Sequence, residues 1–130
     1  MPITATGIRQ ISLVCVPTPD QDRGIEFYES LGFEKRTDTP FGGGYRWVEV
    51  YPPEGGTGIA LAPPPPSGDE VTPLQTGITL RTDDIDATHA ELKELGVDVD
   101  AEVSRMGDPV PPMFWFRDPT GHTLMVVEQR

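Results

Sequence analysis

The chain has 130 residues, and its 10 Lys and Arg against 21 Asp and Glu give a formal net charge of −11. This length predicts one domain, its 36% of hydrophobic residues suffices for a folded core, and the single cysteine excludes an internal disulfide. The acidic excess argues against a nucleic-acid partner, because affinity for phosphates comes mostly from Lys and Arg, and no apolar run approaches the ~20 residues that a membrane helix needs.

The first half of the chain predicts one helix and four strands. Residues 11–16 have the composition of a strand that ends at Pro17. Asp20 is placed to cap a helix that ends at Gly32, because a carboxylate accepts from free N–H groups and glycine tolerates the left-handed stop. The further strands are predicted over residues 33–37, 45–51 and 58–62.

The second half repeats this order after a proline-rich linker, residues 63–73, whose four consecutive prolines suit neither a helix nor a sheet. Asp84 is placed to cap a helix that ends before Gly96. The strands are predicted over residues 77–81, 97–103, 113–117 and 123–128. The second and third of these strands are joined by a loop, residues 104–112. The sequence does not decide whether this loop closes over the cleft as a lid.

An internal duplication underlies the repeated order. A shift of about 64 residues places Val14 on Ile78 and Asp20 on Asp84, and it also superposes the two helix-ending glycines. The chain is therefore predicted to have an α+β fold of two tandem βαβββ modules. Because one helix covers only one face of a four-stranded sheet, the modules are expected to combine.

The expected architecture is a single domain over residues 1–130, with a first module at about 7–62 and a second at about 75–128. The two modules are expected to form a curled mixed sheet around a cleft, with the helices on the outside. Two histidines are given structural roles: His89 falls on the packing stripe of its helix, and His122 follows the glycine of the last turn.

This layout resembles the vicinal oxygen chelate superfamily, which includes glyoxalase I, extradiol dioxygenases and bleomycin-resistance proteins. The segments that carry the resemblance run from Ile25 to Phe33, Thr82 to Asp86, Glu91 to Gly96 and Phe116 to His122. The similarity covers nearly the whole chain and is specific for the fold rather than the activity. It implies, for the enzymes of the family, one divalent metal ion held by His, Gln or Glu side chains from four strands, which acts as a Lewis acid.

The positions that the resemblance assigns to the metal ligands hold no suitable side chain here. They are occupied by Leu13, Leu61, Gly77 and Met125. A divalent ion of this kind prefers imidazole nitrogen or carboxylate oxygen, and a thioether is a poor substitute. We therefore expect neither a bound metal nor another cofactor.

Strand alternation indicates which side chains face the cleft, because successive residues of a strand point to opposite faces. The expected ligand-binding residues are Leu13, Cys15, Trp47, Glu49, Thr79, Arg81, Met113, Trp115 and Met125. Two Trp and two Met side chains suit a flat, partly apolar organic ligand better than a phosphate or a metal. Cys15 is expected to act as a small hydrophobe.

The resemblance and the cleft composition together favour a binding protein for a planar or aromatic small molecule, as in the bleomycin-resistance proteins. The alternative is a lyase or dioxygenase with a diverged or metal-free active site, for which Glu49 and Arg81 are the catalytic candidates. A third possibility is a structural or regulatory protein whose cleft is filled by its own Trp side chains. We also expect a cytoplasmic homodimer, either side by side or strand-exchanged.

Overall fold

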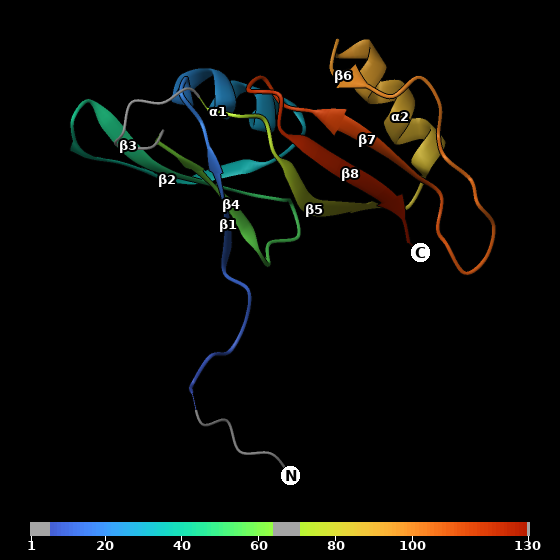
Figure 1. Ribbon diagram of the computed structural model, residues 1–130, viewed down its shortest axis with the longest axis horizontal. Helices are drawn as coiled ribbons and strands as arrows, with labels where there is room; N and C mark the ends of the chain where they lie inside the picture. The colour runs from blue at the N-terminus through green and yellow to red at the C-terminus, as the bar shows by residue number, and fades with distance from the viewer. Residues whose placement is uncertain (1–5, 64–70, 130) are drawn as a thin grey trace.

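A computed structural model describes residues 6–63 and 71–129 of the chain and shows two modules with the same order of elements (Figure 1). The first module contains β1 (Leu13–Pro17), α1 (Gln21–Ser30), β2 (Glu34–Gly42), β3 (Tyr45–Tyr51) and β4 (Gly58–Ala62). The second contains β5 (Gln75–Thr82), α2 (Ile85–Glu94), β6 (Asp98–Val99), β7 (Met113–Arg117) and β8 (Thr123–Glu128). The predicted α+β fold of tandem βαβββ modules is confirmed, while most of the predicted linker lies outside the described residues.

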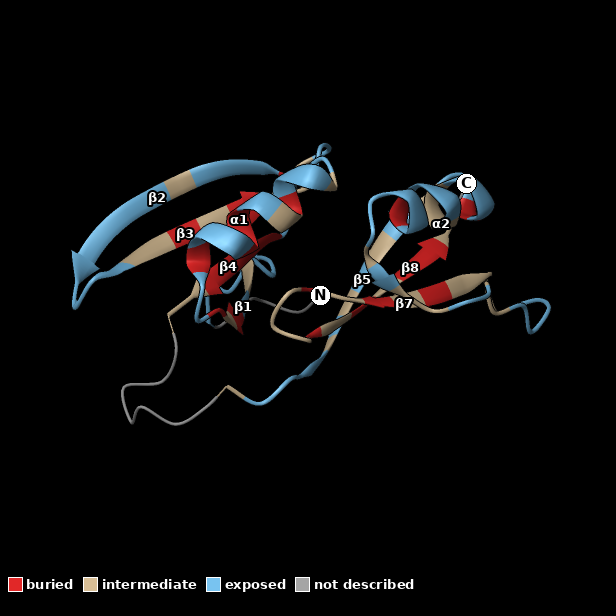
Figure 2. Ribbon diagram, turned by 90° about the horizontal axis from the view of Figure 1, so that it is seen from above, coloured by how far each residue is buried: buried red, intermediate tan, exposed pale blue. Residues whose placement is uncertain are grey.

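Each module builds its own four-stranded sheet, and the two sheets have equivalent topologies. The strand orders are β1-β4-β3-β2 and β5-β8-β7-β6, with the first pair parallel and the others antiparallel in both. Within the described residues no ladder joins the two sheets, so they stay open rather than closing into one curled sheet. Seen from above, they form two lobes side by side, with the helices at the periphery (Figure 2).

Both helices begin and end where the sequence predicts. The Asp20 carboxylate accepts a hydrogen bond from the N–H of Arg23 at 3.1 Å, and the Asp84 carboxylate accepts one from the N–H of Ala87 at 3.1 Å. The chain then turns at a glycine with positive φ after each helix. Neither helix among the described residues is long and apolar enough to cross a membrane.

Four strand predictions differ from the structure. β1 begins two residues later than predicted and β5 begins two residues earlier, while β2 and β6 differ more. β2 continues to Gly42, well beyond residue 37, because it forms a hairpin with β3 in which Thr39 lies opposite Trp47. β6 is limited to Asp98–Val99 instead of residues 97–103. The chain leaves the sheet after the Asp100 N–H donates to the carbonyl of Trp115.

The core lies between each sheet and its helix. Val48 and Val50 of β3 and Phe114 and Phe116 of β7 are fully buried there, as their alternation predicts. Phe27 of α1 reaches across to the second module, where its ring centroid lies 6.2 Å from that of Phe116. The two cores are therefore in contact through the first helix.

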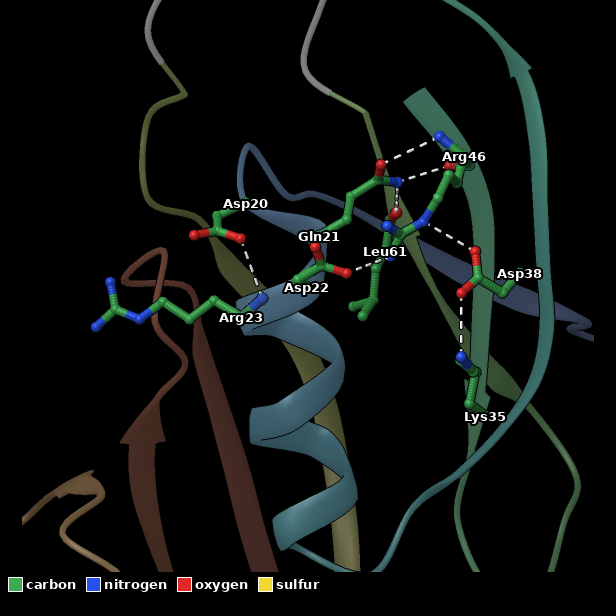
Figure 3. A network of polar contacts seen from close by, with 8 residues as sticks. All are labelled: Asp20, Gln21, Asp22, Arg23, Lys35, Asp38, Arg46 and Leu61. Carbon is green, nitrogen blue, oxygen red and sulfur yellow. Dashed lines mark hydrogen bonds and ion pairs between the residues drawn. The ribbon is translucent and has the colours of Figure 1, made fainter. Parts of the chain in front are cut away.

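The buried amide of Gln21 fastens the start of α1 to the first sheet (Figure 3). Its Nε2 donates to the carbonyls of Arg46 at 2.6 Å and Leu61 at 2.8 Å, and its Oε1 accepts from the N–H of Arg46 at 3.1 Å. The Arg46 guanidinium also forms ion pairs with Asp22 and Asp38. One side chain thus satisfies three backbone groups of two strands.

A second buried polar group, His122, joins the modules. The N–H of Leu74 donates to its Nδ1 at 3.0 Å, so this nitrogen is the acceptor and carries no proton. The Nε2–H then donates to the carbonyl of Pro17 at the end of β1, 2.7 Å away. His122 orders the last turn as predicted, since its N–H donates to Asp118, and in addition it links the second module to the first.

Asp118 is the centre of the same junction. Its carboxylate accepts hydrogen bonds from the Tyr28 hydroxyl of α1 at 3.0 Å and from the backbone N–H groups of Thr120 and His122. Burial, followed by the negative charge of Asp118, raises the pKa of Tyr28 far above its usual range. The phenol is therefore held as a neutral donor.

His89 packs as the helix pattern predicts. Its Nε2 lies 2.7 Å from the carbonyl of Asp100, and its ring meets that of Phe114 edge to face at a centroid distance of 4.9 Å. This histidine therefore supports the core of the second module.

Candidate functional site

Each sheet has one face that turns away from its helix, which we call its open face. On β3 the half-buried side chains of Trp47, Glu49 and Tyr51 alternate with the fully buried Val48 and Val50. Because alternate residues of a strand point to opposite sides, these three side chains lie on the open face of the first sheet.

The strand register groups further residues with Glu49. Cys15 of β1 lies beside Ala60 of β4, which in turn lies beside Glu49, and Thr37 of β2 completes the row. Paired neighbours in a sheet point to the same side, so the predicted cleft residues Cys15, Trp47 and Glu49 do share one face. Cys15 is exposed there. Leu13 lies two residues before Cys15 on the same strand and the same face.

The second sheet brings together the other predicted residues. Met125 of β8 lies between Thr79 of β5 and Trp115 of β7. Arg81 and Met113 flank Val127 in the neighbouring row. The second sheet therefore carries these predicted ligand-binding residues: Thr79, Arg81, Met113, Trp115 and Met125.

Leu61 is on the wrong face for a cleft position. It is fully buried, and a Cβ added at Gly24 of α1 would stand 3.3 Å from its Cδ1, so its side chain packs against the helix. In the second sheet Met125 lies beside Thr79. Thr79 corresponds to Cys15 in the first module, and Cys15 lies beside Ala60. The counterpart of Met125 is therefore Ala60, because the spacing between the modules grows by one residue before β4.

The residues at the four corrected positions do not fit a divalent metal ion. Leu13, Ala60, Gly77 and Met125 offer two apolar side chains, a glycine and a thioether, with no nitrogen or oxygen donor among them. No cluster of three or more His, Cys, Asp or Glu side chains that could hold a metal occurs among residues 6–63 and 71–129.

The two catalytic candidates lie in different sheets. Both carboxylate oxygens of Glu49 already accept hydrogen bonds, from Trp47 Nε1 at 2.7 Å and from the Tyr51 hydroxyl at 2.8 Å. The exposed Arg81 instead lies 3.7 Å from Asp83. Tyr51 was missed in the sequence analysis, although its spacing from Trp47 and Glu49 along one strand would have placed it on the same face.

A cavity of about 740 Å³ lies between the two modules, and most of its lining lies outside the open faces. Its walls include Ile78 and Leu80, which pack against the core on the helix side, and Val14, whose neighbour on β4 is the core residue Ile59. Of the predicted ligand-binding residues, only Thr79 and Arg81 line it. One chain therefore does not gather the predicted residues of both sheets into this cavity.

Comparison with known proteins identifies relatives over almost the whole chain. A family model described as Glyoxalase/Bleomycin resistance protein/Dioxygenase superfamily matches residues 10–126. The uncharacterized protein YurT of Bacillus subtilis is 29% identical over 129 residues, which cover 92% of this chain and 99% of YurT.

Solved structures show the same fold. TnmS3, an antibiotic binding protein from Streptomyces sp. CB03234, is 32% identical with a TM-score of 0.78, covering 96% of this chain and 99% of TnmS3. A member of the same superfamily from Sphaerobacter thermophilus is 33% identical with a TM-score of 0.82, covering 94% of this chain and 98% of that chain.

Proposed function

The chain belongs to the Glyoxalase/Bleomycin resistance protein/Dioxygenase superfamily, and we propose that it binds a planar or aromatic organic molecule of the antibiotic type without a metal ion. The observation that carries the proposal is the composition of the open faces: Trp47 lies on one sheet, Trp115 lies beside Met125 on the other, and the described residues hold no metal donor set. Aromatic and thioether side chains suit a flat, polarisable ligand. The similarity to the antibiotic binding protein TnmS3 supports the same class of ligand.

The surroundings of Glu49 favour binding over catalysis. A general base must reach the substrate proton, and here each carboxylate oxygen already accepts a hydrogen bond from a neighbouring side chain, which leaves only its second lone pair for a substrate. The proposal therefore assigns no reaction to the open faces. A cytoplasmic location is proposed with it, because Cys15 is exposed and unpaired, a state that a reducing compartment preserves.

We further propose that the working unit is a homodimer. Within the described chain, β1 and β5 each end a sheet and pair on one side only, and open strand edges are usually covered in stable proteins. Ile8 and Ile11, just before β1, are 76% and 73% exposed on a segment that runs away from both sheets (Figure 1). A two-fold pair would place β1 of one chain beside β5 of the other and bring their open faces together.

The ligand proposal is tested by quenching of Trp fluorescence with two planar or antibiotic probes, daunorubicin and bleomycin. We expect saturable quenching with a Kd on the order of tens of micromolar or tighter, unchanged by EDTA. Trp115→Ala should weaken binding at least ~10-fold, because truncation of an aromatic anchor costs about 2 kcal/mol or more.

Leu95→Ala is the matched control for that experiment. Leu95 is an apolar side chain that is 54% exposed just after α2, away from the open faces, so its loss should leave the affinity unchanged. Equal weakening by both variants, or no quenching by either probe, would contradict the proposal. Binding that disappears with EDTA would instead show a metal site that the donor set does not predict.

The dimer proposal predicts a change of mass on a single exposed substitution. Ile11→Asp should convert the dimer to a monomer in sedimentation velocity, because it places a charge in the proposed contact while touching little of its own chain. Leu95→Asp is the control and should remain dimeric. A wild-type protein that sediments as a monomer at its highest soluble concentration would contradict the proposed homodimer.

A further inference from the structure

The carboxylate of Glu49 lies between two aromatic side chains of its own strand. It accepts one hydrogen bond from the indole of Trp47 at 2.7 Å and another from the hydroxyl of Tyr51 at 2.8 Å, one on each oxygen. Hydrogen bonds to an ionised carboxylate are stronger and more directional than those between neutral groups. Glu49 therefore connects the two rings into one unit on the open face of the first sheet.

Tyr51 is itself held in place from two sides. A Cβ added at Gly58 of β4 would stand 2.7 Å from the Cε2 of Tyr51. Because glycine has no side chain at this position, the phenol ring can lie close to the sheet. The Arg36 guanidinium carbon lies 4.6 Å from the ring centroid. The hydrogen bond to Glu49, more than burial, raises the pKa of Tyr51, so this phenol stays a donor.

The two Trp residues differ in one respect that bears on ligand recognition. Indole has a single N–H donor and no acceptor. In Trp47 this donor is used by Glu49, whereas in the described part of the chain the N–H of Trp115 makes no hydrogen bond. The first indole therefore has only its ring to offer, and the second has its ring and a donor.

We propose that Glu49 is a positioning residue: it fixes the plane of the Trp47 indole, so that this ring meets a ligand by its face alone. The geometry favours a ligand with a planar, apolar part over Trp47 and a hydrogen-bond acceptor over Trp115. This inference rests on the proposed function, because it assumes that a ligand reaches the open faces. A side chain that is already locked by its neighbours recognises a ligand with less loss of freedom.

The first arm of the test needs no ligand. In a Trp115→Phe background Trp47 is the only Trp of the chain, and its near-ultraviolet circular dichroism reports how rigidly the indole is held. Glu49→Leu should abolish most of this signal, and Tyr51→Phe should weaken it through Glu49 without touching Trp47. Glu49→Gln should keep it, since the amide oxygen still accepts from the indole. Thr37→Val, across the strand from Glu49, is the control and should change nothing.

The second arm measures daunorubicin affinity in the same variants with Trp115 intact. We expect a several-fold loss in Glu49→Leu and retention in Glu49→Gln. An unchanged Trp47 signal in Glu49→Leu would overturn the inference. So would an equal loss of affinity in both variants with the Trp47 signal kept in Glu49→Gln, because the carboxylate would then contact the ligand itself. If the unmodified protein binds no daunorubicin or bleomycin, the proposed function fails while the first arm still decides the role of Glu49.

Discussion

Asp118→Ala is expected to lower the free energy of unfolding by about 3 kcal/mol, because it leaves the buried Tyr28 hydroxyl and two backbone N–H groups without an acceptor. For a domain of this length, such a loss corresponds to a fall in Tm of about 10 °C. Urea denaturation and thermal unfolding followed by circular dichroism give the two values. The effect is large because a single carboxylate serves both modules at their junction.

Two comparison variants make this result specific. Asp83→Ala removes a carboxylate whose side chain is 77% exposed and whose ion pair with the exposed Arg81 is long, at 3.7 Å. The free energy of unfolding should therefore change by less than about 0.5 kcal/mol. Tyr28→Phe leaves Asp118 its two backbone donors and should cost about 1 kcal/mol. If Asp118→Ala were as mild as Asp83→Ala, the junction would not depend on this carboxylate.

Gln21→Ala is expected to destabilise the protein by about 2 to 3 kcal/mol. Its amide is buried, and truncation would leave two carbonyls and one N–H of β3 and β4 unpaired (Figure 3). The start of α1 would then lose its buried polar link to the sheet and keep the exposed ion pair of Asp22 with Arg46. Urea denaturation measures the loss, and hydrogen exchange of the Arg46 amide should accelerate in parallel, because this N–H donates to Gln21.

A second substitution at the same position tests whether the donating amide of Gln21 is what stabilises the protein. Gln21→Glu should be at least as destabilising as Gln21→Ala, because a carboxylate would face the carbonyl oxygens of Arg46 and Leu61 in place of the donating Nε2. Gln10→Ala, at an exposed position before β1, is the matched control and should have no measurable effect. A Glu variant as stable as the wild type would show that the amide hydrogen bonds contribute little.

The proposed dimer gives the two open faces a common role. Within one chain, Trp47 and Trp115 belong to separate sheets, and the cavity between the modules is lined by neither. A second copy that pairs β1 with β5 would bring one Trp from each chain to the same site. The ligand experiment and the dimer experiment are therefore linked, and Ile11→Asp is expected to weaken daunorubicin binding as well as to change the mass.

Features that depend on residues close in sequence were predictable. Asp20 and Asp84 cap their helices because the accepting carboxylate and the donating N–H are three residues apart. β3, β4, β7 and β8 were predicted with the bounds that the structure has, since alternation has a period of two residues and turns have characteristic compositions. The duplication, and with it the α+β fold, followed from the same local signals repeated once.

Features that depend on contacts between distant residues were decided by the tertiary structure alone. The counterpart of Met125 is Ala60 and not Leu61, because strand pairing rather than a constant spacing fixes which residues share a face. His122 bonds to Pro17 across 105 residues, and no local pattern specifies such a partner. Sequence determined the elements and the alternation along each strand. Strand pairing and the packing of the two modules determined which residues share a face and how the faces are joined, because register and buried polar pairs depend on the whole fold.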